Sequence, residues 1–276
     1  MTLTEKPGNE RLSAVLAVKN EAHQIRECLE QLSFADEIVI VDMNSTDGTA
    51  EICRELGHQV ITSDGGPHGL IHVNKNLGFE AARGPWILNL DADERLSPGL
   101  REEILGALRS PEPQVAAFAL PFTHYFFGKY LRHGGFRGSL VRLFRKGSLQ
   151  YPEDRAHSSP IINGEVRELK NLVVHFNHRR IADFVEKMNL YTSSDAPLFL
   201  AHGKGGLRNR PLPTRVRALI TAPLSVFWNR YVRHAGFRDG VHGFVAAVLL
   251  SFYQFVEYAK VWELQHVGLA EAEEKK

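Results

Sequence analysis

The sequence predicts an α/β protein: a mostly parallel sheet flanked by helices, then a mixed sheet region and a C-terminal helical tail. Short apolar segments alternate with helical patterns from residue 12 to residue 90. Such alternation is typical of a parallel sheet with right-handed crossovers. Beyond residue 96, short apolar segments are separated by glycines and followed by long apolar helices. We therefore expect the parallel sheet first and the mixed sheet after it.

The first half of the chain contains the predicted parallel sheet. Its apolar segments have the length and composition of buried strands. The expected strands cover residues 12–18, 36–42, 59–62 and 86–90, and the expected helices cover 22–32, the segment that Gly57 ends, and 73–82. Ser45 fits the N-cap of the second helix. Polar residues follow successive strands, namely Asn20 and Glu21, then Asp42, then Asp91 and Asp93.

The second half begins with a helix that starts at Ser97-Pro98. Further strands are expected at residues 115–121, 125–131, 139–145 and 166–176, and a long amphipathic helix at about 181–202. His175 and His178 are expected to end the last strand. The remaining segment, residues 208–263, is basic at both ends of an apolar middle.

Composition is that of an ordinary globular protein. The 276 residues are 43% hydrophobic and carry a formal net charge of +1, so no overall electrostatic attraction favours nucleic acid. Cys28 and Cys53 form no metal-ligand spacing, which fits core packing in a reducing compartment. The first 11 residues lack the apolar core of a signal peptide, and no uninterrupted apolar run reaches the roughly 18 residues of a spanning helix. We therefore expect a cytoplasmic protein.

An apolar run at residues 85–90 ends in three carboxylates, Asp91, Asp93 and Glu94. Open α/β sheets bind their ligands at the carboxyl ends of the strands. Acids this close repel one another unless a cation lies between them, and Mg²⁺ or Mn²⁺ is held by one or two carboxylates together with substrate phosphates. The run therefore indicates a metal that bridges the protein and a diphosphate. A solvated turn is the alternative.

Four motifs resemble those of the family 2 glycosyltransferases, which have the GT-A, Rossmann-like fold. They are AVKNE at 17–21, VDMNSTDGT at 41–49, NKNLG at 74–78 and LDADE at 90–94. Further segments resemble the branch that includes lipopolysaccharide-core β-glucosyltransferases: RLFR at 142–145, His157, KMNLYT at 187–192, GFRDG at 236–240 and YAKVWE at 258–263. The resemblance covers residues 12 to 263 and implies the use of a nucleoside-diphosphate sugar, with UDP as the expected carrier.

The resemblance also implies roles for single residues. Asp42 would contact the uracil or the ribose, since a carboxylate accepts hydrogen bonds from an imide N–H or from hydroxyls. Asn20 and Glu21 would line the nucleotide pocket beside the backbone of Ala17. Lys75 would face the diphosphate, with a solvated lysine as the alternative.

Asp93 would be the principal metal ligand, and Asp91 would contact the ribose or the metal. Glu94 is expected to orient its neighbours.

An inverting transfer needs a general base for the acceptor hydroxyl, and here the chain departs from its relatives. Where they carry His-Glu, this chain has His157-Ser158. Asp154 and His157 remain as candidate catalytic residues, with Glu153 behind them, while a packed histidine is the alternative for His157.

The resemblance implies a division of the chain into parts. These are a disordered N-terminus at 1–11, a catalytic domain at 12–205 with a nucleotide half (12–95) and an acceptor half (96–205), a helical region at 206–263 and a polar tail at 264–276. Expected partners are a sugar nucleotide and a glycan or lipid-linked acceptor of the cell envelope. Two other functions remain open: a degenerate domain that binds a glycan or a partner, and a nucleotidyltransferase. Against the second, Lys19-Asn20-Glu21 is not a glycine-rich loop.

The sequence of residues 208–263 predicts that this segment attaches the protein to the inner face of the cytoplasmic membrane. Residues 244–256 form an apolar run that is long for an exposed soluble helix. Tryptophan and tyrosine side chains suit the interfacial zone. Arginines surround a second apolar stretch at 219–228, at positions 208, 210, 215, 217, 230, 233 and 238. The alternative is that these helices bury their apolar faces against the catalytic domain or across an oligomer interface.

Overall fold

The computed structural model divides the chain into two compact units. The sheet unit comprises Met1–Thr123 and Gly138–Phe176, and the helical unit comprises His124–Arg137 and Asn177–Lys276. The structure describes residues 11–64, 71–152, 159–178, 180–202 and 212–274. The expected disorder at the N-terminus therefore lies outside the described residues.

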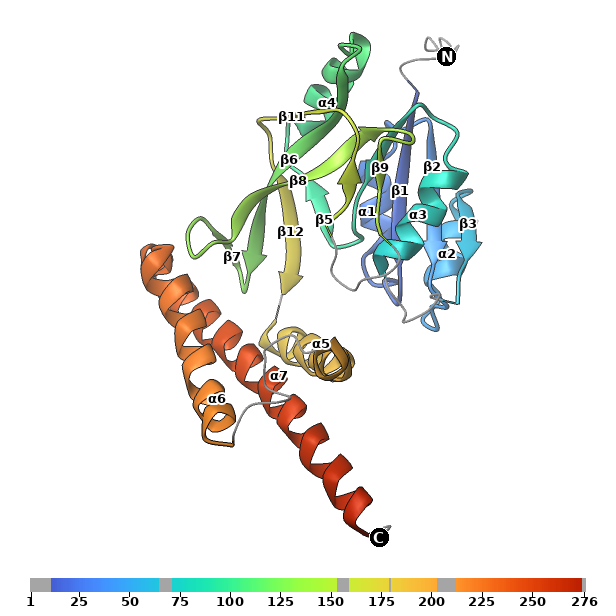
Figure 1. The fold of residues 1–276 in the computed structure, drawn as a ribbon. Coiled ribbons are helices and arrows are strands. Elements are labelled where there is room, and N and C mark those ends of the chain that lie inside the picture. The colour runs from blue at the N-terminus through green and yellow to red at the C-terminus, as the bar shows by residue number, and fades with distance from the viewer. Residues whose placement is uncertain (1–10, 65–70, 153–158, 179, 203–211, 275–276) are drawn as a thin grey trace. The chain divides into compact units, whose positions relative to one another are not determined.

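The first half of the sheet is parallel, as expected (Figure 1). Its strands lie in the order β3-β2-β1-β4 and cover Gln59–Thr62, Glu37–Asp42, Leu12–Val18 and Trp86–Asn89. The register pairs Val18 with Asp42 and Leu12 with Trp86, so the carboxyl ends of the strands meet at one edge. This edge carries the polar residues that follow each strand.

The second half is mixed, because β8 (Arg137–Arg145) runs antiparallel to β4. Next in the sheet come β6 (Val115–Phe126), β12 (Val173–His178) and β5 (Glu94–Leu96), with β11 (Glu165–Glu168) and β7 (Lys129–Leu131) paired to β6. β9 (Leu149–Gln150) and β10 (Ile161–Ile162) form a small separate sheet. The expected mixed region is confirmed.

Helices cover both faces of the sheet. On one face, α1 (Ile25–Gln31), α2 (Thr49–Glu55) and α4 (Leu100–Arg109) pack over a cluster that includes the fully buried Leu12 and Leu16. On the other face, α3 (Ile71–Ala81) packs Phe79 against Val15, Ile87 and Phe144. Side chains along β1 therefore alternate between two hydrophobic cores, one on each face of the sheet.

Three local expectations were wrong. The strand expected at 125–131 is a hairpin, because Phe127 (φ 46°) and Gly128 (φ 92°) are left-handed and turn β6 into β7. The strand expected at 166–176 is divided between β11 and β12. Helix α2 has Gly48 as its N-cap, while the Ser45 hydroxyl instead accepts a hydrogen bond from the backbone N–H of Asn20 at 2.9 Å.

The helical unit is held together by helix packing and by one buried carboxylate. It contains α5 (Ile181–His202), α6 (Leu212–Phe227), the π-helix η3 (Trp228–Arg233), the 3-10 helix η4 (Gly236–Asp239) and α7 (Val241–Glu274). α7 packs against both α5 and α6. Asp239, 3% exposed, accepts hydrogen bonds from the backbone N–H groups of Arg132 and His133. By length and composition alone, one described segment, Val241–Gln265, could cross a membrane.

The close approach of α3 to β1 makes a first prediction. A Cβ added at Gly78 would lie 2.4 Å from Cγ1 of Val15, so Gly78→Ala should lower the free energy of unfolding by about 1–3 kcal/mol. Gly106→Ala is the matched control, since Gly106 lies in α4 with nothing within 4 Å of its Cβ position. There alanine should raise stability by up to about 1 kcal/mol. Urea unfolding measures both changes, and an equal stabilisation in the two variants would contradict the close packing.

Candidate functional site

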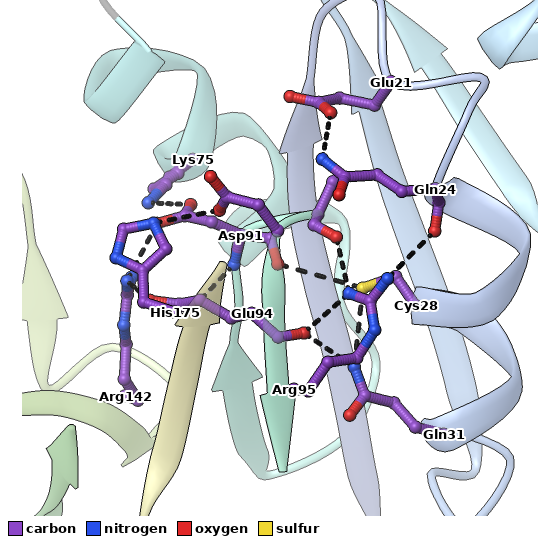
Figure 2. A network of polar contacts seen from close by, with 12 residues as sticks. Glu21, Gln24, Cys28, Gln31, Lys75, Asp91, Glu94, Arg95, Arg142 and His175 are labelled. Carbon is purple, nitrogen blue, oxygen red and sulfur yellow. Dashed lines mark hydrogen bonds and ion pairs between the residues drawn. The ribbon is translucent and has the colours of Figure 1, made fainter. Parts of the chain in front are cut away.

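The acids that follow β4 are engaged in a network of ion pairs at the carboxyl edge of the sheet (Figure 2). One carboxylate oxygen of Asp91 lies 2.6 Å from Nζ of Lys75 in α3, and the other lies 2.8 Å from a guanidinium nitrogen of Arg142 in β8. The same guanidinium group pairs with Glu94 at the start of β5. The second oxygen of Glu94 accepts the backbone N–H of Asp91 at 3.0 Å. Two acids and two bases from separate elements are therefore joined in one cluster.

Most of this cluster is removed from water. Glu94 is 1% exposed, and Lys75 and Arg142 are each 6% exposed. The alternatives of a solvated turn and of a solvated Lys75 are therefore wrong. Glu94 contacts the guanidinium group of Arg142 and accepts the backbone N–H of Asp91.

Burial and the neighbouring charges together lower the pKa of Asp91 and raise the pKa values of Glu94 and Arg142. Burial alone would raise the pKa of Asp91, but the charges and hydrogen bonds of Lys75 and Arg142 lower it well below the usual range. Burial raises the pKa of Glu94 against the opposing charge of Arg142. Burial acts to lower the pKa of Arg142, and the charges of Glu94 and Asp91 overcome this effect and raise it. Asp91 and Arg142 are therefore ionised at neutral pH.

Asp93 points to a different partner. Its carboxylate lies 3.0 Å from Nε2 of His175 in β12. Burial acts to lower the pKa of His175, but the hydrogen bond and charge of Asp93, together with the charges of Glu94 and Asp91, raise it. The side chains of Asp93 and His175 keep 14% and 21% of their surface exposed. A carboxylate oxygen and an imidazole nitrogen thus lie side by side with access to solvent.

The acidic residues after β4 do not form a complete metal site, but they fit a site that substrate and water complete. Within the described ranges, no group of three or more His, Cys, Asp or Glu side chains could hold a metal by itself. Mg²⁺ commonly takes only one or two protein ligands and completes its shell with substrate phosphates and water. The carboxylate of Asp93 fits such a partial shell, whereas the imidazole nitrogen of His175 is not a donor that Mg²⁺ prefers. Asp91 fits it less well, since both of its oxygens already have cationic partners.

The adjacent rim of the edge is built by two interlocked loops. Asn20 has a left-handed backbone (φ 57°), and its side-chain oxygen accepts the backbone N–H of Thr46 at 2.8 Å. The backbone N–H of Glu21 donates to the hydroxyl of Thr49 at 2.8 Å. Asparagine adopts this conformation more readily than most residues because its short polar side chain can hydrogen-bond nearby backbone. The first loop is therefore fixed in place by the loop that follows β2.

Asp42 lies at the base of this rim and is 2% exposed. One of its oxygens accepts the backbone N–H of Ser45 at 3.1 Å, and the other has no hydrogen-bond partner among the described residues. Ala17 lies beside it in β1, paired with Val41. The edge thus contains a buried acceptor with unused hydrogen-bonding capacity.

Sequence reasoning gave Arg142 no role and gave His175 little weight. The sequence does contain a signal for Arg142, because this charged residue directly precedes two apolar residues, Leu143 and Phe144. Both are fully buried in β8, so the arginine beside them needs a buried partner. A side-chain contact from α1 was also missed: Gln31 binds the backbone of Glu94 and of Leu96 at 2.8 and 2.7 Å. The glutamine thereby fixes the turn that carries the acids (Figure 2).

The structure brings together Lys75, Asp91, Asp93 and Glu94, and separately ties Asn20 and Glu21 to the loop beside Asp42. The candidate bases Asp154 and His157, together with Ser158, fall in 153–158, outside the described residues. β12 ends at His178, as expected.

Comparisons with known proteins find glycosyltransferases of similar length. The lipopolysaccharide core biosynthesis glycosyltransferase LpsC of Rhizobium meliloti (strain 1021) is 29% identical over 262 residues, which cover 91% of this chain and 92% of LpsC. An uncharacterized glycosyltransferase of Rickettsia prowazekii (strain Madrid E), RP128, is 28% identical over 92% of this chain and 87% of its own length.

Solved structures support the fold. The mannosyltransferase PcManGT from Pyrobaculum calidifontis, in complex with GDP-Man and Mn²⁺, superimposes with a TM-score of 0.50 at 17% identity, over 91% of this chain and 87% of that one. The GT-A fold expected from the motifs is thereby confirmed. The profile of the family described as glycosyl transferase family 2 matches residues 13–165, more than half of the chain. The chain therefore belongs to glycosyl transferase family 2 and is a glycosyltransferase.

Proposed function

We propose that this enzyme transfers a hexose, with inversion, from a nucleoside-diphosphate sugar to a glycan or glycolipid acceptor. UDP is the expected carrier, and cell-envelope polysaccharide or lipopolysaccharide is the expected product. The observation that carries the proposal is the acidic turn after β4, which meets the loops beside Asp42 at one edge of a parallel sheet. The role that LpsC has in lipopolysaccharide core biosynthesis supports the choice of product.

The nucleoside would bind along the rim. Asp42 offers a buried oxygen that has no hydrogen-bond partner within the described part of the chain, and an acceptor left in this state is costly unless a donor reaches it. A uracil imide N–H or a ribose hydroxyl would supply that donor. Asn20, Glu21 and the backbone of Ala17 would form the wall of the pocket.

The diphosphate would lie beside the acidic turn. A divalent metal held by Asp93, with His175 next to it, would supply Lewis-acid neutralisation of the departing nucleoside diphosphate. Asp91, fixed between Lys75 and Arg142, would contact the ribose or approach the metal. Lys75 would reach the phosphates only by giving up its 2.6 Å pair with Asp91, so in this conformation it serves to hold that carboxylate.

Acceptor activation would come from the segment outside the described residues. Asp154 and His157 stay the proposed general bases, since the glutamate usual after the histidine is replaced by Ser158. A lipid-linked acceptor would bring the enzyme to the inner face of the cytoplasmic membrane. A thermal-shift panel of UDP-, GDP- and dTDP-sugars with Mn²⁺ tests the proposal as a whole, because a ligand at 100 times its dissociation constant stabilises by about 2.7 kcal/mol.

Metal dependence gives the second prediction. Asp93→Asn keeps the shape and removes the charge, so it should abolish transfer and the metal-dependent part of UDP affinity, while the unfolding temperature without ligand stays close to wild type. Glu30→Gln, on the exposed side of α1, is the control for loss of a carboxylate. Titration calorimetry with Mn²⁺ or with EDTA measures the affinity. Equal UDP affinity of the wild-type enzyme in both buffers would contradict the metal site.

The general base gives the third prediction. If Asp154 or His157 takes the acceptor proton, then Asp154→Asn or His157→Ala should lower turnover by about 10² to 10⁴. Donor affinity should change little, because the base acts on the acceptor. Initial rates at saturating donor separate the two effects. Full turnover in both variants would place the base elsewhere.

The buried ion pairs give the fourth prediction. Arg142→Leu leaves Glu94 without its cation and should cost about 3–5 kcal/mol of unfolding free energy. Adding Glu94→Leu removes the stranded charge and should recover most of that loss. Arg137→Leu, at the exposed start of the same strand, is the control and should lie within about 0.5 kcal/mol of wild type. Failure of the second change to recover stability would mean that Glu94 is not the partner that matters.

A further inference from the structure

α7 exposes a row of large apolar side chains. The exposed residues recur at intervals of three, four and seven, which places them along one side of the helix. They are Val241, Phe244, Val248, Phe252, Phe255 and Trp262, between 40% and 75% exposed. The opposite side packs on the helical unit with the buried Ala246, Ala247 and Val261 and the half-buried Leu249, Leu250, Tyr253 and Val256. An amphipathic helix of a water-soluble protein would instead show polar side chains on its outward side.

A second apolar stripe runs along α6 and η3. Ile220, Leu224 and Trp228 follow one another at intervals of four and are 59%, 62% and 64% exposed, and Val232 continues the series at 37%. The two stripes meet at Phe244, whose ring centroid lies 6.0 Å from that of Phe227 and 5.7 Å from that of Tyr231. We call these two stripes together the docking face.

The charge around the docking face is mostly positive. Residues 212–262 contain five arginines and Lys260 against two acids, Asp239 and Glu257, and Glu257 is 8% exposed. Asp239 is 3% exposed, and its carboxylate accepts two backbone N–H groups, so it presents little negative charge to solvent. Arg217, Arg233 and Arg238 are exposed. The surface that α6, η3, η4 and the first half of α7 offer to a partner is therefore apolar and cationic.

A hollow lies next to the most exposed aromatic residue of this face. Its volume is about 360 Å³, and it is lined by Ser225, Val226, Trp228, Asn229 and Arg233. A guanidinium group, an amide and a hydroxyl lie here beside an indole ring. Donors of this kind suit an anionic head group, and tryptophan is enriched at the level where lipid head groups begin.

We propose that the docking face binds the surface of an anionic lipid bilayer, with the apolar stripes entering the head-group region and the arginines meeting the lipid phosphates. Charge complementarity favours this occupant over a second copy of the chain, because a symmetric contact would bring arginines against arginines. Each cation near an anionic leaflet contributes on the order of fivefold in affinity. This inference rests on the proposed function in one respect: a lipid-linked acceptor would give the enzyme a reason to bind a membrane.

The helix contacts of α7 favour lying on the bilayer over crossing it. Only 22% of the apolar window in Val241–Gln265 is buried, so this is not the enclosed core helix of a soluble protein. Yet Glu257 is 8% exposed within the helical unit, and Lys260 donates to Asn189 and Thr192 of α5 at 2.7 and 2.9 Å. A crossing helix would have to carry both charges, together with the α5 partners of Lys260, into the hydrocarbon. A helix on the surface leaves these contacts intact.

Flotation of the full-length protein with vesicles tests the proposal, without donor or acceptor present. The protein should float with vesicles of phosphatidylcholine mixed with phosphatidylglycerol, float far less with phosphatidylcholine alone, and be released by high salt because salt screens exposed charges. Failure to float with anionic vesicles at low salt would overturn the proposal and leave the transfer reaction untouched. Binding that resists both high salt and alkaline carbonate would overturn it in favour of a crossing helix.

Paired variants assign the effect to the docking face. Leu224→Gln with Trp228→Gln, and separately Arg233→Glu, should each lower the vesicle partition coefficient at least tenfold. Ile161→Gln and Arg109→Glu are the matched controls, since both residues are exposed in the sheet unit. Unfolding temperatures close to wild type verify that each variant is folded. Equal loss in variants and controls would overturn the assignment of this face.

Discussion

The buried cluster of Lys75, Asp91, Glu94 and Arg142 is the interaction on which the rest of the catalytic edge depends. Taking four charges out of water is costly, and only their mutual pairing offsets the cost. The members come from α3, from the turn after β4, from β5 and from β8, so the pairing is complete only when all four elements are in register. Arg142 reaches the acids because β8 pairs with β4 through Leu143 and Leu88. The cluster therefore ties the parallel half of the sheet to the mixed half.

The same cluster separates the tasks of two carboxylates that are only two positions apart. Asp91 is saturated by cations of the protein itself, and its low pKa shows how strongly they stabilise its charge. The carboxylate of Asp93 pairs with the titratable His175 and keeps access to solvent. A ligand can displace a titratable histidine from the carboxylate of Asp93 more readily than it can displace a buried guanidinium group from the carboxylate of Asp91. The geometry therefore supports assigning anchoring to Asp91 and ligand contact to Asp93.

The parallel half of the fold could be predicted from the sequence because each strand is a short apolar run with polar residues at its end. Asn20 and Glu21 follow the first strand, and Asp42 ends the second. The hairpin at Phe127-Gly128 was missed because its first left-handed residue is a phenylalanine, which rarely adopts that conformation. The carboxylates of the site were found because Asp91, Asp93 and Glu94 lie within four positions of the chain. Their cations were not assigned, since Arg142 lies 51 positions from Asp91 and meets it only through strand register.

α7 shows a further limit of sequence periodicity and also what the structure adds. The helix is apolar on nearly every side, so its sequence does not indicate which side faces the protein. The structure shows that Leu249, Leu250 and Tyr253 pack toward the protein, while phenylalanines and Trp262 face outward. Burying a large apolar side chain gains about 1.5–3 kcal/mol. Folding of the chain alone leaves this gain unused for the outward row, and exposed apolar area of this kind marks an interaction surface.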